Sequence, residues 1–207
     1  MKLWSDFYDL VVPDLPGCPF AAVDSALRQA AIAFCEQSLA WKYVHPSVSV
    51  VAGTATYAFI PPAEAAVHAI TYAELDDKEI ESHAGESGIR IARWRHRTGT
   101  PEYILGGPAF LTLVPAPCAD GSLTMIVALK PAPASTGIDD TQYNEYREAI
   151  AHGAMARMML SPKKPYTDLP LAQHHAQQFA IKTAAAGIRV ASSHTRAPLI
   201  TAILQRG

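Results

Sequence analysis

Apolar residues recur at intervals of three and four along three long stretches of the chain, residues 20–39, 141–161 and 169–191. This spacing is typical of helices that bury one face. Pro19 opens the first stretch, where a helix leaves its first N–H groups unpaired, and Pro162 ends the second. A short amphipathic stretch, residues 5–12, comes before them. The recurring positions are Val23, Leu27, Ala30, Ala31 and Phe34, then Tyr143, Tyr146, Ile150, Ala154 and Met158, then Ala172, Ala176, Phe179, Ala180, Ala184 and Ile188.

The third helix differs from the others because most of its stripe is alanine. Small side chains let a second helix approach closely, so this stripe predicts a helix contact.

The pattern changes between residues 43 and 131, where Val, Thr, Tyr and Ile alternate in short runs cut by Pro and Gly. The pair Gly106 and Gly107 predicts a tight hairpin turn, because glycine tolerates positive φ. The strands that we predict are residues 47–51, 55–60, 66–75, 89–94, 102–105, 110–114 and 123–129.

These patterns together predict an α+β fold: a helical bundle with an antiparallel β-domain inserted between the first long helix and the last two. Residues 1–42 and 132–197 would form the helical domain and residues 43–131 the β-domain. Residues 198–207 would be a C-terminal tail.

Charge is scarce, since only 17% of the residues are Asp, Glu, Lys or Arg against roughly a quarter in typical soluble proteins. A shortfall of surface charge weakly favours a surface that other subunits cover. The formal net charge of −2 does not indicate binding to nucleic acid or membrane by bulk electrostatics. Cys18, Cys35 and Cys118 are far apart, which favours reduced thiols over disulfides or zinc. With no signal peptide or membrane-spanning run, we expect a soluble protein made inside the cell and no membrane partner.

Motifs for catalysis are missing, so we expect no catalytic, cofactor-binding or metal-binding residues. The adjacent His174 and His175 point about 100° apart on a helix and are poor joint ligands. The sequence holds neither a nucleotide-phosphate loop nor a nucleophile elbow. The alternative is a small α+β enzyme with a scattered site, for example Tyr146, Glu148 and His152 on one helix. Such a pair at i, i+4 is more often a surface interaction than an acid–base pair.

Four arginines and a tryptophan lie within residues 90–97, and Arg93, Trp94, Arg95 and Arg97 are the interface candidates among them. Arg and Trp are common in protein interfaces, which favours a contact with a neighbouring subunit. The second interpretation is non-specific contact with passing DNA, because Arg reaches phosphates and Trp stacks on bases.

The chain ends with an apolar segment after Pro198, in which Leu199, Ile200, Ile203 and Leu204 are interface candidates. This tail either packs on its own domain or docks on a partner as an added strand.

The order of several short motifs resembles the head-to-tail adaptor, or connector, proteins of tailed bacteriophages, including the tail tubular protein A type. The likeness extends from residue 15 to residue 188. Its motifs are LPGCP at 15–19, LRQAA at 27–31, PEY at 101–103, LVPAP at 113–117, ALKP at 128–131, YREAIAHGA at 146–154 and KPY at 164–166.

This resemblance implies a structural virion protein that is not an enzyme. It would form a homo-oligomeric, dodecameric ring that joins the portal protein to the tail tube or nozzle protein and surrounds the DNA exit channel. Such a subunit would lie in the tail neck of the virion after assembly in the host cytoplasm. The alternative within the same class is another virion ring, a stopper or a tail terminator.

Overall fold

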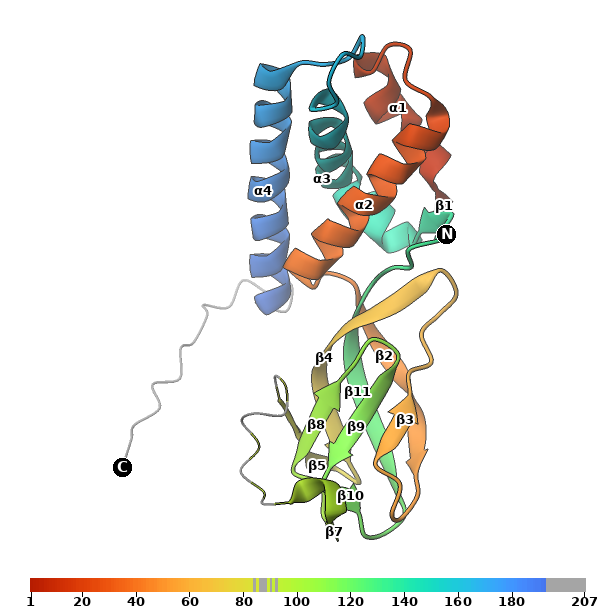
Figure 1. The fold of residues 1–207 in the computed structure, drawn as a ribbon, viewed down its shortest axis with the longest axis vertical. Helices are drawn as coiled ribbons and strands as arrows, with labels where there is room; N and C mark the ends of the chain where they lie inside the picture. Colours follow the sequence, from red (N-terminus) through yellow and green to blue (C-terminus); the bar gives the residue numbers. More distant parts are fainter. Residues whose placement is uncertain (84, 86–88, 90, 92, 193–207) are drawn as a thin grey trace, which may run out of the picture. The chain divides into compact units, whose positions relative to one another are not determined.

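A computed structural model describes residues 1–83, 85, 89, 91 and 93–192 (Figure 1). The chain divides into two compact units. The helical unit consists of Met1–Ala40 and the chain from Gly137 onward, and the β unit is Trp41–Thr136. Helices and largely antiparallel sheets thus occupy separate parts of the chain, and the predicted α+β fold is confirmed.

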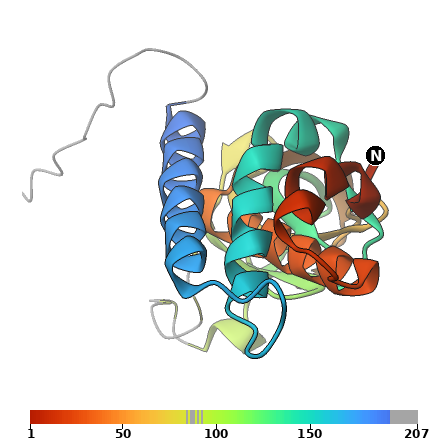
Figure 2. The ribbon, with the colours of Figure 1, turned by 90° about the horizontal axis from the view of Figure 1, so that it is seen from above.

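The helical unit is built from α2 (Phe20–Ser38), α3 (Asp140–Met159) and α4 (Leu169–Ala191), each of which packs against the other two. Figure 2 shows these helices from above, with α4 and α3 side by side. The predicted apolar stripes of α2 and α3 are buried, and the Phe34 and Tyr146 rings meet across them at 4.9 Å. Gly153 permits the close approach of α3, because a Cβ there would lie 2.8 Å from the Phe179 ring.

The ends of the long helices are formed in different ways. Pro19 stands at the N-cap of α2, and Leu39 ends this helix with φ of 52° while its N–H donates to the Cys35 carbonyl. Asp139 accepts a hydrogen bond from Thr141 N at the start of α3, and Asp168 accepts one from Leu171 N at the start of α4. An N-cap carboxylate satisfies N–H groups that the helix leaves unpaired.

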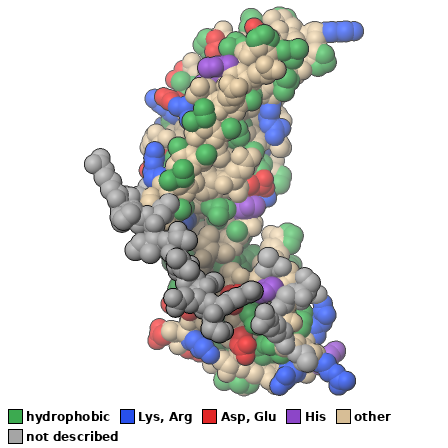
Figure 3. All heavy atoms as spheres, turned by 90° about the vertical axis from the view of Figure 1, so that its left-hand side faces the viewer, with side chains coloured by type: hydrophobic (Ala, Val, Ile, Leu, Met, Phe, Trp, Pro, Cys, Tyr) green, Lys and Arg blue, Asp and Glu red, His purple; other side chains and the backbone are tan. Residues whose placement is uncertain are grey.

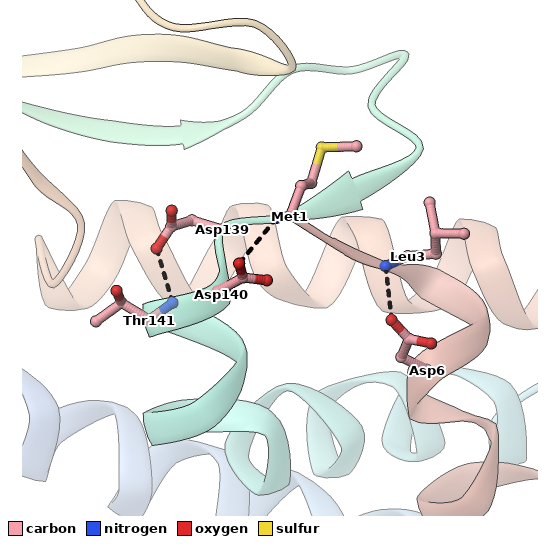
Figure 4. Close-up of polar contacts among 6 residues, drawn as sticks. All are labelled: Met1, Leu3, Asp6, Asp139, Asp140 and Thr141. Atoms are coloured by element: carbon pink, nitrogen blue, oxygen red, sulfur yellow. Dashed lines mark hydrogen bonds and ion pairs between the residues drawn. The ribbon is translucent and has the colours of Figure 1, made fainter.

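The first residues of the chain are tied to this bundle (Figure 4). The strand β1 (Lys2–Leu3) pairs antiparallel with β12 (Gly137–Ile138), and the N-terminal amine lies 3.0 Å from Asp140 Oδ2. A 3-10 helix (Trp4–Phe7), α1 (Tyr8–Val11) and a second 3-10 turn (Val12–Asp14) follow. Leu3 N donates to Asp6 Oδ2, and the rings of Trp4 and Phe7 are buried.

In the β unit, two sheets share one apolar core. One has the strand order β2-β11-β4-β5 and the other β3-β9-β8-β6. Buried side chains of β8 and β9 join those of β4 and β11 in this core, which identifies a sandwich. The strands are β2 (Lys42–Val50), β3 (Thr56–Ala58), β4 (Ala65–Leu75), β5 (Lys78–Glu79), β6 (Glu81–Ser82), β7 (Thr98–Gly99), β8 (Tyr103–Gly106), β9 (Phe110–Val114), β10 (Ala116–Pro117) and β11 (Gly121–Pro131).

Two sequence predictions for the β unit have different outcomes. The hairpin at Gly106 and Gly107 is confirmed, since β8 and β9 pair antiparallel and Gly107 N donates to the Phe110 carbonyl. The tight two-glycine turn is wrong, because Gly106 is the last residue of β8 and neither glycine has positive φ. The strand predicted over residues 89–94 is wrong among the described residues there: Ile91 is in a bend, Arg93 has φ of 54°, and Trp94–His96 is a 3-10 helix. The alternation of apolar and arginine residues is typical of a strand, but Arg93 and Trp94–His96 form a turn.

Candidate assembly surfaces

A long apolar surface extends along α4 in the helical unit. Ile181 and Ile188 are each 62% exposed, although isoleucine is usually buried, and Ala176, Ala180 and Ala184 are exposed beside them. Figure 3 faces this side of the helical unit and shows hydrophobic side chains along its length. A contiguous exposed apolar surface of this kind is typical of sites that another molecule covers.

Part of this surface forms a shallow groove of about 500 Å³. Gln37 of α2 contributes one wall, and the rest comes from α4: Ala180, Thr183, Ala184, Gly187, Ile188 and Ala191. We call it the α4 groove.

The position of the alanine stripe corrects one detail of the sequence analysis. Only Ala172 of the predicted stripe is buried, and α4 instead turns a different face toward α2 and α3. That face consists of Ala172, His175, Thr183, Ala186 and Val190. Two apolar faces on one helix have similar periodicity, so spacing alone could not tell which one the chain buries itself.

Two exposed ion pairs join α4 to α3. Lys182 Nζ lies 2.7 Å from Glu148 Oε2, and Arg189 Nη1 lies 3.9 Å from Glu145 Oε2. The hydrogen bond from Lys182 is the main reason that the pKa of Glu148 is lowered. These pairs are exposed and contribute little stability, and they mark the side of α4 that lies next to α3.

The arginine-rich segment of the β unit forms a compact turn. Trp94 opens the 3-10 helix Trp94–His96 and is partly buried, and the Arg95 guanidinium lies 4.6 Å from the centre of its ring. Arg93 and Arg97 flank this turn with exposed side chains, and neither forms an ion pair with another described residue. The four candidate residues therefore lie in one exposed cationic turn, in which Arg95 packs over the Trp94 indole. We call it the arginine turn.

The apolar tail candidates Leu199, Ile200, Ile203 and Leu204 lie outside the described residues. Their role as interface residues stays a prediction.

A histidine pair that the sequence did not reveal joins α3 to α4. His152 Nδ1 lies 2.8 Å from His175 Nδ1, so one ring nitrogen donates to the other. His174 packs edge-on against His175 at 5.6 Å. Burial is the main reason that the pKa values of His152 and His175 are both lowered, and the neighbouring histidines lower them further. The residues are 23 apart in sequence, a separation at which helical spacing gives no signal.

In the scattered enzyme site considered as an alternative, Glu148 and His152 have different hydrogen-bond partners among the described residues. Glu148 binds Lys182 and His152 binds His175, so the two are engaged with different partners. Within the described part of the chain, no group of three or more His, Cys, Asp or Glu side chains is placed to hold a metal ion. A search of the described helices also finds none with the length and apolar character needed to cross a membrane.

Comparison with protein families places the chain among phage adaptor proteins, a class of structural virion components. The model that matches is described as SU10 adaptor protein, and it covers residues 5–202, nearly the whole chain. The chain belongs to this family, which confirms the phage adaptor that the order of motifs predicted. A search of curated protein sequences finds no match. The relation to the tail tubular protein A type stays a prediction.

Proposed function

We propose that this protein is the subunit of a ring that joins the portal to the tail and surrounds the DNA exit channel. The observation that carries the proposal is the family match over residues 5–202. The subunit acts by binding alone, with no catalytic step and no cofactor. Its partners are further copies of itself in a dodecamer, the portal protein on one side and the tail tube or nozzle protein on the other. It assembles in the host cytoplasm and ends in the tail neck.

The α4 groove supports contact between neighbouring copies. Alanine and glycine in its floor let the backbone of a partner approach closely. Covering an exposed isoleucine such as Ile188 stabilises a complex by about 1–2 kcal/mol. Scarce surface charge agrees with a molecule that keeps part of its surface in contact with other subunits.

Electron microscopy of the full-length protein, alone and mixed with its portal protein, tests the proposal. We expect a closed ring seated on the portal. A ring that forms without binding the portal would favour a stopper or tail terminator. Particles that stay monomeric in the presence of the portal would contradict the proposal.

A pair of alanine substitutions tests the groove itself. Ala184→Glu places a carboxylate in the α4 groove, where a neighbouring copy would bury it without a partner, at a cost of several kcal/mol. Ala58→Glu is the control, since Ala58 is also an exposed alanine but belongs to β3 and does not line the groove. We expect the first variant to stay monomeric with portal present and the control to form rings.

We further propose that the arginine turn contacts a neighbouring protein subunit. The stacked Arg95 and Trp94 present a flat surface that is apolar and cationic, a combination enriched in protein interfaces. Replacing Arg93, Arg95 and Arg97 with Ala should impair ring assembly. Intact rings that retain less DNA in filled heads would instead assign the turn to DNA contact.

A further inference from the structure

Among the described residues of the β unit, one strand has an open edge. β4 pairs with β11 along its length, but β5 covers its other side only at Glu74 and Leu75. Beyond these, Ile80 N donates to the Ala73 carbonyl and the Ser82 hydroxyl approaches the Ile70 carbonyl at 3.5 Å. Among the described residues, the backbone of residues 66–72 therefore forms backbone hydrogen bonds on one side only.

A cleft of about 540 Å³ lies along this edge. β4 contributes Val67 and Ile70, while the end of β8 and its turn contribute Gly106, Gly107 and Pro108. The edge of β8 is covered only in part, because β6 pairs with Tyr103 and Ile104 alone. The cleft is thus bounded by incompletely paired strands from both sheets.

The chemistry of the cleft suits an extended peptide. Val67 and Ile104 are buried and Ile70 is half-buried, so the floor is apolar, while His68 and Ser82 are exposed at the cleft. Backbone groups at a sheet edge bind an added strand through main-chain hydrogen bonds, and apolar pockets take alternate side chains. A peptide with β-branched or large apolar residues would satisfy both features.

We propose that the open edge of β4 receives the C-terminal segment of a neighbouring copy, residues 199–204, as an added strand. The sequence Leu-Ile-Thr-Ala-Ile-Leu is rich in residues favoured in strands, and six residues are enough to span the part of β4 that lies beyond Ser82, residues 66–69. Consecutive side chains of a strand point to opposite faces, so Leu199, Thr201 and Ile203 share one face.

The choice of a neighbouring copy rests on the proposed ring, because a strand exchanged between copies joins subunits whereas a strand paired within its own chain does not. Thr201→Pro is the test variant, since proline removes an N–H in the middle of the segment and a strand that needs this group cannot pair.

Hydrogen–deuterium exchange of the full-length protein measures directly whether the backbone amides at the β4 edge are protected. A synthetic peptide of residues 193–207 is added in excess to the dilute Thr201→Pro protein. We expect exchange in residues 66–72 to slow at least tenfold, and a peptide that carries Thr201→Pro to have no effect. Unchanged exchange in residues 66–72 would overturn the proposal whether or not rings form.

Variants in the cleft show whether the peptide binds there. A Cβ at Gly106 would lie 3.6 Å from Ile70 Cδ1, an ordinary contact, so Gly106→Val should fold but fill the cleft. Gly106→Val should reduce at least tenfold the slowing of exchange in residues 66–72 that the peptide causes. Ala58→Val at the exposed edge of β3 should leave this slowing unchanged. Equal effects of both variants would contradict the assignment.

Exchange in rings on the portal distinguishes a neighbour from the same chain. The edge should be protected in wild-type rings and unprotected in the dilute wild-type monomer. Protection in the dilute wild-type monomer that Thr201→Pro removes would show pairing within one chain and overturn the neighbouring copy. If the peptide protects the edge but no ring forms on the portal, the β4 edge binds the C-terminal segment and the proposed function is wrong.

Discussion

The His152–His175 pair should make the helical unit less stable as the pH falls below neutrality. Both pKa values are lowered in the folded protein, chiefly by burial. The hydrogen bond between the two Nδ1 atoms needs one of them unprotonated. Protonation of both imidazoles would leave two cations in contact. The charged groups nearby are Glu148, which favours the cation at His152, Lys182, which disfavours it, and Asp14, which favours the cation at His175.

The sign follows from linkage. Since the folded pKa lies below the unfolded value of about 6.5, the unfolded chain binds more protons between the two values. The stability that the unprotonated histidine pair contributes is therefore fully present above about pH 6.5. It is lost as the pH falls toward the folded pKa. Each histidine contributes at most about 1.4 kcal/mol per pH unit in this window. His152 is partly open to water, so we expect a total loss of about 1 kcal/mol between about pH 7.5 and pH 5.5.

The perturbation is the double substitution His152→Leu with His175→Leu, which removes both partners and so leaves neither nitrogen unpaired. Such a change is close to neutral at pH 7.5 and should abolish most of the pH dependence. Urea unfolding followed by circular dichroism at the helical band gives the free energy of unfolding at each pH. His68→Gln is the control, since His68 is exposed on β4. The reasoning is refuted if the double variant loses as much stability as the wild type between the two pH values.

Three further predictions concern single residues. Asp168→Ala removes the hydrogen bond to Leu171 N at the start of α4 and should lower the free energy of unfolding by about 1 kcal/mol, measured in urea; an unchanged value would mean that water replaces the cap. Gly137→Val would drive a Cβ into the Lys2 carbonyl, so the pairing of β1 with β12 should open at a cost of about 1–3 kcal/mol and amide exchange at Ile138 should accelerate. Burial raises the pKa of the Cys35 thiol to about 12, so in a protein with Cys18 and Cys118 replaced by Ser it should resist a thiol reagent near neutral pH and react only in denaturant. Rapid reaction of the folded variant would show that Cys35 is accessible.

Sequence patterns predicted the helices well because helical periodicity can be seen within a short stretch of sequence. Each of α2 and α3 buries the stripe that its spacing indicated, and Pro19 marks the start of α2 as expected. The hairpin at Gly106 and Gly107 was equally local, although neither glycine adopts the positive φ on which the prediction rested.

Features that depend on distant residues could not be predicted in this way. The buried face of α4 is decided by contacts with α2 and α3, and the His152–His175 pair exists only because two helices are packed together. The arginine turn shows the opposite problem, since its alternation was typical of a strand while Arg93 adopts positive φ. Of the candidate interface residues, the structure describes only those of the arginine turn. The open edge of β4 could not be predicted from the sequence, because it depends on which strands pair.

The division of the chain also sets an order on its synthesis. α2 lies before the β unit in sequence, while its packing partners α3 and α4 lie after it. A ribosome therefore releases every strand of the sandwich before α2 can meet the helices that cover its apolar face. During that interval Phe34 and its neighbours have no completed core to enter, so the newly made chain must keep this face from aggregating until translation reaches residue 191.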